Sequence, residues 1–209
     1  MNTEIIPAIL VQDEQTFIER LRIVEGLATS VQIDCMDGHF VANRTWYEAG
    51  SMDTTLGIEL HLMVSDPRLT IQAWRRVPQL ERAIWHIEIP MDHTAAIEDC
   101  RALGIECGLA ISPETPVEKL LPYLERIDEV LVLGVTPGWS GQKLIASTIE
   151  KISAVKRINP AILVGFDGGV TLDNLKSIAE AGADRINLAS ALFKTPDPRE
   201  TLRAILSSI

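Results

Sequence analysis

Acidic and imidazole side chains stand on apolar runs in three separate parts of the chain, at Asp34, His61 and Asp167. Carboxylate and imidazole groups can move protons near neutral pH, and together they are suitable ligands for zinc, manganese or iron. Each group alone has an ordinary explanation, because a carboxylate after a strand often caps the next helix and a buried histidine often completes a core hydrogen bond. Their convergence at one place would predict a catalytic or metal site.

The alternation of side chains along these runs predicts which of them point the same way. Residues two apart in a strand lie on the same face of the sheet. Gln32 and Asp34 therefore share a face, and so do Glu59 and His61. Asp167 ends a third apolar run and is followed directly by two glycines. We expect polar side chains from several strands to face one interior.

Turns that follow three of the predicted strands could hold a phosphate group. They are Thr136–Gly141, Gly168–Gly169 and Ala189–Ser190. The first is expected to lead into a helix that begins near Gln142, so its backbone amides could surround an anion. Phosphate often binds after the last two strands of an α/β barrel. Each turn by itself is a weak signal, because glycines after strands are common.

Short apolar runs alternate with amphipathic stretches along the whole chain, which predicts a parallel sheet with crossover helices. The expected strands are Glu4–Leu10, Val31–Cys35, Gly57–Met63, Arg82–Ile87, Glu106–Ile111, Glu129–Val135, Ala161–Phe166 and Ala183–Leu188. The expected helices are Asp13–Leu27, Pro67–Val77, Ala95–Leu103, Pro116–Glu125, Gln142–Ile158, Leu172–Ala181 and Arg199–Ser207. This pattern predicts an α/β fold, the (β/α)8 or TIM barrel, as a single domain over residues 1–209.

The connection from Met36 to Thr55 is long and has no helical stripe. Long loops of this kind lie over the mouth of a barrel, although a merely solvated loop is equally compatible with the composition. The residues expected near a ligand are Asn43, Arg44 and Trp46. The residues expected to cap the helices that follow them are Thr115 and Thr171.

The chain is strongly acidic, with 29 Asp and Glu residues against 19 Lys and Arg residues and a net charge of -10. This charge repels nucleic acids and anionic membranes, so neither is expected as a partner. A bound phosphate must then be held mainly by local backbone amides. The 3 cysteines have no CxxC spacing and predict buried, reduced thiols. Without a signal-like segment at the N-terminus, we expect a soluble, cytoplasmic protein.

Six stretches of the sequence resemble the ribulose-phosphate 3-epimerase family in order and spacing. They are Pro7–Leu10, Asp34–Asn43, His61–Val64, Trp85–Glu88, Pro137–Gln142 and Asp167–Val170. The resemblance implies a ribulose-phosphate-binding barrel that interconverts ribulose 5-phosphate and xylulose 5-phosphate by moving a proton at the carbon beside the ketone. Asp34 and Asp167 are then the acid/base pair, one for each face of the planar intermediate. Family members commonly form homo-oligomers, so one is expected here.

The same resemblance implies a metal ion and a substrate pocket. One divalent ion, zinc, manganese or iron, is expected on Asp34, His61 and Asp167, with Gln32 as a candidate fourth ligand. The residues expected to contact the sugar and its phosphate are His61, Met36, Met63, Gly138, Trp139, Ser140, Gly141, Gly168, Gly169, Ala189 and Ser190. Met36 and Met63 are also compatible with ordinary core packing. His39 and His86 match the family too and are expected to be structural.

Several positions depart from the family pattern. Gln32 stands where the family has its first metal-binding histidine, and an amide oxygen is a weaker ligand than imidazole, so metal affinity should fall or selectivity should change. Ala8 replaces a serine that contacts the substrate. The remaining changes are Ser140 and Ala189 in place of glycines, Trp139 in place of a phenylalanine and Ala42 in place of a proline.

Two other functions fit part of the pattern. A barrel that binds a phosphosugar without converting it, in a binding or regulatory role, would account for Gln32 and Ala8. The presence of both aspartates favours an epimerase over this alternative. A decarboxylase or aldolase of the phosphate-binding barrels would carry an Asp-x-Lys-x-x-Asp motif, but Met36 occupies the lysine position here.

Overall fold

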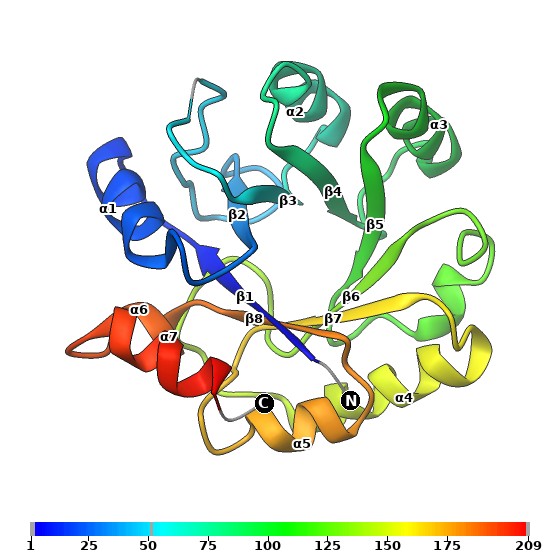
Figure 1. The fold of residues 1–209 in the computed structure, drawn as a ribbon. Helices are drawn as coiled ribbons and strands as arrows, with labels where there is room; N and C mark the ends of the chain where they lie inside the picture. Colours follow the sequence, from blue (N-terminus) through cyan, green and yellow to red (C-terminus); the bar gives the residue numbers. More distant parts are fainter. Residues whose placement is uncertain (1–2, 51, 208–209) are drawn as a thin grey trace.

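The computed structural model describes residues 3–50 and 52–207. In this part of the chain, eight parallel strands close into a barrel in which β8 pairs with β1 (Figure 1). The strands are β1 (Glu4–Ile9), β2 (Ser30–Met36), β3 (Gly57–Met63), β4 (Leu80–His86), β5 (Glu106–Ile111), β6 (Glu129–Leu133), β7 (Leu163–Asp167) and β8 (Arg185–Leu188). The expected (β/α)8 barrel is confirmed.

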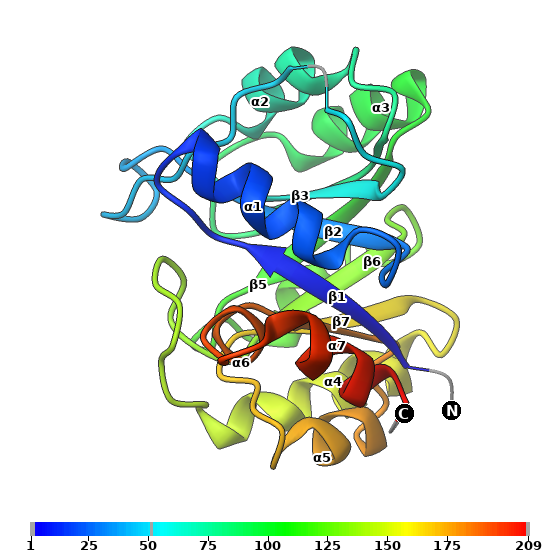
Figure 2. The same ribbon diagram turned by 60° about the vertical axis from the view of Figure 1, so that its left-hand side comes forward.

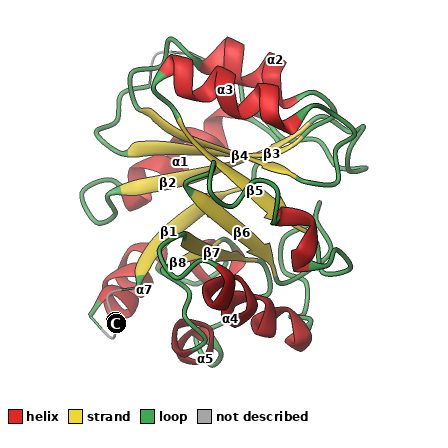
Figure 3. Ribbon diagram, turned by 90° about the vertical axis from the view of Figure 1, so that its right-hand side faces the viewer, coloured by secondary structure: helices red, strands yellow, loops and turns green. Residues whose placement is uncertain are grey.

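Helices join the strands and cover the outside of the barrel (Figures 2 and 3). They are α1 (Glu14–Val24), α2 (Pro67–Trp74), α3 (His93–Leu103), α4 (Ile149–Ile158), α5 (Leu175–Glu180), α6 (Ser190–Phe193) and α7 (Pro198–Leu206), with short 3-10 helices η1 (Val117–Leu120) and η2 (Ala146–Thr148). Four helices begin after an aspartate whose side chain accepts a hydrogen bond from a first-turn N–H, which fixes where the loop ends. These caps are Asp13, Asp66, Asp92 and Asp197.

The helix expected over Pro116–Glu125 is reduced to η1 and turns. Pro122 lies in the middle of this segment, and proline cannot donate the backbone hydrogen bond that a continuous helix needs. The prediction that Thr115 caps it is also wrong, because η1 begins after Pro116 without a side-chain cap. The apolar residues at helical spacing in this segment were therefore not enough to form a continuous helix across one proline.

Two later helices begin further along the chain than expected. The start of α4 lies well beyond Gln142, whose Nε2 donates to two backbone oxygens of the preceding turn at 2.7 and 2.8 Å. That turn is therefore closed by a side chain and does not run into a helix. Similarly, α5 starts at Leu175 and not at Leu172. Thr171 caps nothing, and its N–H instead donates to Asn174 Oδ1 at 2.7 Å.

Charged side chains fill the N-terminal end of the barrel interior. Arg185 Nη1 lies 2.6 Å from Glu129 Oε2 and also contacts Glu59, while Arg82 Nη1 lies 2.9 Å from Glu59 Oε2. Glu59 shares a strand face with His61, as predicted, but it is two residues nearer the start of β3. It therefore belongs to this buried ion cluster and not to the opposite end of the barrel.

No helix of the described ranges is long and apolar enough to cross a membrane. Cys35, Cys100 and Cys107 are buried and form no disulfide, as the sequence predicts. Burial raises the pKa of the Cys100 and Cys107 thiols to about 12, which keeps both protonated at neutral pH.

Candidate active site

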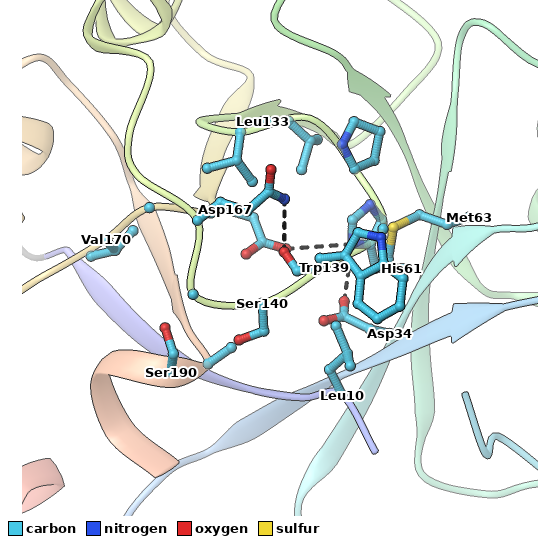
Figure 4. Close-up of a pocket in the computed structure, with 18 of the residues that line it drawn as sticks. Leu10, Asp34, His61, Met63, Leu133, Trp139, Ser140, Asp167, Val170 and Ser190 are labelled. Carbon is cyan, nitrogen blue, oxygen red and sulfur yellow. Dashed lines mark hydrogen bonds and ion pairs between the residues drawn. The ribbon is translucent and has the colours of Figure 1, made fainter. Parts of the chain in front are cut away.

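A pocket opens at the carboxyl ends of the strands, where active sites of (β/α)8 enzymes lie (Figure 4). Every residue expected to contact the sugar or its phosphate lines this pocket. The lining consists of Leu10, Asp34, Met36, His61, Met63, Leu133, Val135, Pro137, Gly138, Trp139, Ser140, Gly141, Gln142, Asp167, Gly168, Gly169, Val170, Ala189 and Ser190. The loops after β6, β7 and β8 thus meet the ends of β2 and β3.

Asp34, His61 and Asp167 meet in this pocket. Asp34 lies on β2, His61 lies beside it in register on β3, and Asp167 ends β7 on the other side of the barrel. His61 Nδ1 lies 3.0 Å from Asp34 Oδ1 and 3.4 Å from Asp167 Oδ2. Figure 4 shows the three side chains pointing toward one another. The convergence predicted from three separate strands is confirmed.

Gln32 lies beneath this group and is fully buried. Its Nε2 donates to Asp34 Oδ1 and to Asp167 Oδ2, each at 2.8 Å. Its Oε1 accepts a hydrogen bond from Asn187 Nδ2 at 2.7 Å. Asn187 was not among the site residues expected from the sequence. The available signal was that Arg185 and Asn187 are polar residues two apart on β8, and so face the barrel interior together.

The burial and the close charges shift the pKa values of this group. Burial raises the pKa of Asp34 to about 6, and the neighbouring Asp167 carboxylate acts in the same direction. Burial lowers the pKa of His61, but hydrogen bonds to Asp167 and Asp34 outweigh it and raise that pKa to about 9. Without a bound ion, these pKa values favour a protonated His61 between the two carboxyl groups at neutral pH, and Asp34 can both accept and release a proton there.

A second histidine orients the first. His61 Nε2 lies 3.1 Å from His86 Nε2, and His86 Nδ1 lies 3.1 Å from Glu88 Oε2. Burial lowers the pKa of His86, so its neutral form donates Nδ1–H to Glu88 and accepts the Nε2–H of His61. This leaves Nδ1 of His61 directed at the two aspartates. His86 therefore contacts a site residue, whereas His39, which was grouped with it, is exposed.

The glycine turns after β7 have a backbone that other residues rarely adopt. Gly168 and Gly169 have φ values of 95° and 69°. A Cβ on Gly169 would lie 2.6 Å from Leu144 Cα, so even alanine would displace the neighbouring loop. The turn after β6 does not run into a helix, contrary to the prediction, so no helix N-terminus lies directly behind its backbone amides. Trp139 stands at the pocket with 60% of its surface exposed.

The long loop after β2 supports the pocket without lining it. Asn43 Nδ2 donates to the backbone oxygen of Gly138 at 2.9 Å, which ties this loop to the turn after β6. The backbone of Arg44 pairs with the backbone of Asp37 in an isolated antiparallel β-bridge. The expectation for Trp46 is wrong, because its ring packs against Phe17 of α1 with centroids 4.8 Å apart.

The donor set partly fits a divalent metal ion. One ligand atom from each of Asp34, His61 and Asp167 lies within 4.8 Å of the others, and all three residues are buried. Two carboxylates and an imidazole are suitable ligands for zinc, manganese or iron. Gln32 does not fit as arranged, because the atom it presents to the group is the amide nitrogen, which is a hydrogen-bond donor and not a ligand.

Comparisons with known proteins identify the family to which the chain is similar. The model of the "Ribulose-phosphate 3 epimerase family" matches residues 4–193. The ribulose-phosphate 3-epimerase of Mycobacterium tuberculosis H37Rv is 32% identical over 209 residues, covering 96% of this chain and 90% of that protein. The Bacillus subtilis enzyme of the same name is 31% identical over 215 residues, covering 98% and 99%.

Solved structures show the same fold at low identity. A 3-hexulose-6-phosphate synthase matches with a TM-score of 0.72 at 10% identity, over 99% of this chain and 100% of that one. A tryptophan synthase α-subunit variant from Pyrococcus furiosus also has a TM-score of 0.72, at 16% identity and with the same shares covered. At such low identities, the similarity shows only that the barrel fold is shared.

Proposed function

Because the chain belongs to the ribulose-phosphate 3-epimerase family, we propose that it interconverts D-ribulose 5-phosphate and D-xylulose 5-phosphate, or a closely related pair of ketose phosphates. The observation that supports this most is the approach of Asp34 and Asp167 to one pocket from opposite sides of the barrel, with His61 between them. Epimerisation at the carbon beside a ketone needs one proton-transfer group on each face of the sugar.

Each carboxyl group has one part in the proposed mechanism. In one direction, one carboxylate takes the proton from the carbon beside the ketone, and the electrons of that C–H bond form a planar enediolate. The other carboxyl group then gives its proton to the opposite face of the same carbon. The reverse reaction exchanges the two roles. A pKa of about 6 suits Asp34 to this exchange, because such a group is available in both protonation states near neutral pH.

We further propose a divalent metal ion, zinc, manganese or iron, on Asp34, His61 and Asp167. When bound there, such an ion would polarise the ketone and stabilise the negative charge of the enediolate. His61 is held for this role by His86, which accepts the hydrogen of Nε2 and leaves Nδ1 facing the aspartates.

The phosphate of the substrate is proposed to bind at the other end of the pocket. The backbone amides of Gly141, Gly169 and Ser190 are available there, and Met36 and Met63 would contact the sugar. Lys194 was not expected from the sequence. Its Nζ lies 3.2 Å from the position that a Cβ on Gly141 would take, so one positive charge stands beside these amides in an otherwise acidic protein.

A phosphosugar-binding barrel without turnover is the second candidate. It is favoured by Gln32, whose amide nitrogen contacts both carboxylates, and by Ala8, which lacks a hydroxyl group. Retention of both proton-transfer groups in one pocket favours the epimerase. The predicted homo-oligomer and cytoplasmic location remain predictions, and light scattering of the purified protein would test the first of them.

An assay of ribulose 5-phosphate conversion tests the proposal. The purified protein is stripped with a chelator and then assayed alone and with added zinc, manganese or iron. We expect formation of xylulose 5-phosphate, enhanced by at least one of these ions. Binding of ribulose 5-phosphate with no conversion under any of these conditions would contradict the epimerase and support the binding barrel.

A further inference from the structure

We infer that Gln32 and Asn187 form a fixed amide pair in which Gln32 clamps the two catalytic carboxylates as a hydrogen-bond donor and does not act as a fourth metal ligand. This inference deepens the proposed function, on which it rests for the roles of Asp34 and Asp167. It assigns a positioning role to Asn187 as well. The consequence is a carboxylate pair whose geometry does not depend on a bound ion.

The contacts of Gln32 use both hydrogens of its amide. Nε2 lies 2.8 Å from Asp34 Oδ1 and 2.8 Å from Asp167 Oδ2. These are the same two oxygens that face His61 Nδ1 at 3.0 and 3.4 Å. The amide nitrogen therefore bridges the carboxylates at the atoms a cation would use. The partial positive charge of its two hydrogens offsets the repulsion between the two acids.

Asn187 and the two carboxylates together fix which way this amide points. Its Nδ2 donates to Gln32 Oε1 at 2.7 Å, so a reversed Gln32 would place its own NH2 group against another NH2 group. The reversed Oε1 would also face two carboxylate oxygens, which are acceptors like itself. Asn187 Oδ1 is buried and has no hydrogen-bond partner among the described residues, so Asn187 could turn together with Gln32. That joint reversal would still lose both hydrogen bonds to the carboxylates.

The barrel leaves little freedom for the pair to move apart. Gln32 is fully buried and Asn187 is 2% exposed. Gln32 is in register with Ala8 on β1 and Glu59 on β3, and Asn187 is in register with Asp167 on β7. Both backbones are therefore held by neighbouring strands on a closed sheet. A metal ion on Asp34, His61 and Asp167 would have three protein ligands and would compete with the Gln32 amide for two of their oxygens.

Manganese binding to the chelator-stripped protein, followed by electron paramagnetic resonance without any sugar present, tests this inference. Met has the length of Gln but no amide, so we expect Gln32→Met to bind Mn²⁺ at least as tightly as the wild type. If Gln32 were a ligand, the variant would bind at least about tenfold more weakly, and that result would overturn the inference. Asp34→Asn must weaken binding, which shows that the signal comes from this site, and Gln15→Met on the surface of α1 must not change it.

Two further measurements keep the test decisive if Gln32→Met does not fold. Neutron diffraction of deuterium-exchanged wild-type crystals distinguishes amide nitrogen from oxygen. We expect two deuterons on the Gln32 atom that faces Asp34 and Asp167, and an oxygen in that position would refute the clamp.

The second measurement is Mn²⁺ binding to Asn187→Leu. This variant removes the donor that holds Gln32 Oε1, so we expect binding severalfold tighter than in the wild type. Unchanged or weaker binding would contradict the role of Asn187. None of these measurements depends on turnover. A negative conversion assay would therefore count against the proposed epimerase but would not contradict the role of Gln32 as a hydrogen-bond donor to the two carboxylates.

Discussion

Replacement of His86 by leucine tests how much the orientation of His61 contributes to stability and to catalysis. His86 accepts the Nε2–H of His61 at 3.1 Å, and both imidazoles are almost completely buried. Leucine fills a similar space but leaves that hydrogen without an acceptor. A hydrogen bond to a charged group contributes about 1.5–3 kcal/mol, and a buried charged donor left unpaired costs more. We therefore expect His86→Leu to lower the free energy of unfolding by about 2–4 kcal/mol.

The effect on catalysis should appear in kcat. His86 does not line the pocket, so the KM for the sugar phosphate should stay within about twofold, whereas loss of the orienting partner of a functional histidine lowers activity by about 10–100-fold. Urea unfolding and steady-state kinetics of the same preparation measure both quantities. His86→Gln is the conservative variant, because its amide can accept from His61 and donate to Glu88, and it should recover part of kcat.

His39→Leu provides the matched control. His39 is exposed, and it is its backbone N–H that donates a hydrogen bond to Asp37, so this substitution should change stability by no more than about 0.5 kcal/mol and leave kcat unchanged. If His86→Leu loses stability but keeps the wild-type kcat, His86 supports the core and does not position His61. Equal effects of the two substitutions would refute the reasoning entirely.

Two further predictions concern the pH dependence of stability and the glycine turn after β7. Burial raises the pKa of Glu88, but hydrogen bonds from His86 and neighbouring groups outweigh it and lower that pKa from 4.5 to about 2. Its stabilising effect is therefore present above pH 4.5 and lost as the pH falls toward 2, so Glu88→Gln should flatten the acid side of the stability profile measured by urea unfolding, and an unchanged profile would contradict this. Gly169→Ala should cost about 1–3 kcal/mol and raise the KM for the sugar phosphate. Gly26→Ala has a similar φ of 74° but open space around its Cβ, so equal losses in the two variants would show that the contact with Leu144 is unimportant.

The barrel was predictable because parallel strands are buried on both faces and so appear as short apolar runs. All eight runs became strands, and the main differences lie at their ends: β8 begins at Arg185 and not at Ala183. The helices were less predictable, because one residue can end them. Pro122 interrupts one expected helix, and the Gln142 side chain closes a turn where another was expected to begin.

The site residues were predictable as far as strand position determines them. Asp34, His61 and Asp167 each lie near the carboxyl end of a strand, and barrel closure alone brings such ends together. The direction of the Gln32 amide was not predictable, because it depends on contacts with distant residues, among them Asn187, which lies 155 residues away in sequence. The same holds for His86, whose role arises from the register of β4 against β3 and from Glu88 beyond it.

Solvent deuterium exchange at the carbon beside the ketone tests the two-carboxylate account most directly. In heavy water, the wild-type protein should convert ribulose 5-phosphate to xylulose 5-phosphate with one deuterium introduced at that carbon. Asp34→Asn and Asp167→Asn, each checked for an intact fold, should lower interconversion by at least about 100-fold. Each variant should exchange at most the epimer whose proton faces the remaining carboxylate. Interconversion at the wild-type rate by either variant would contradict the account.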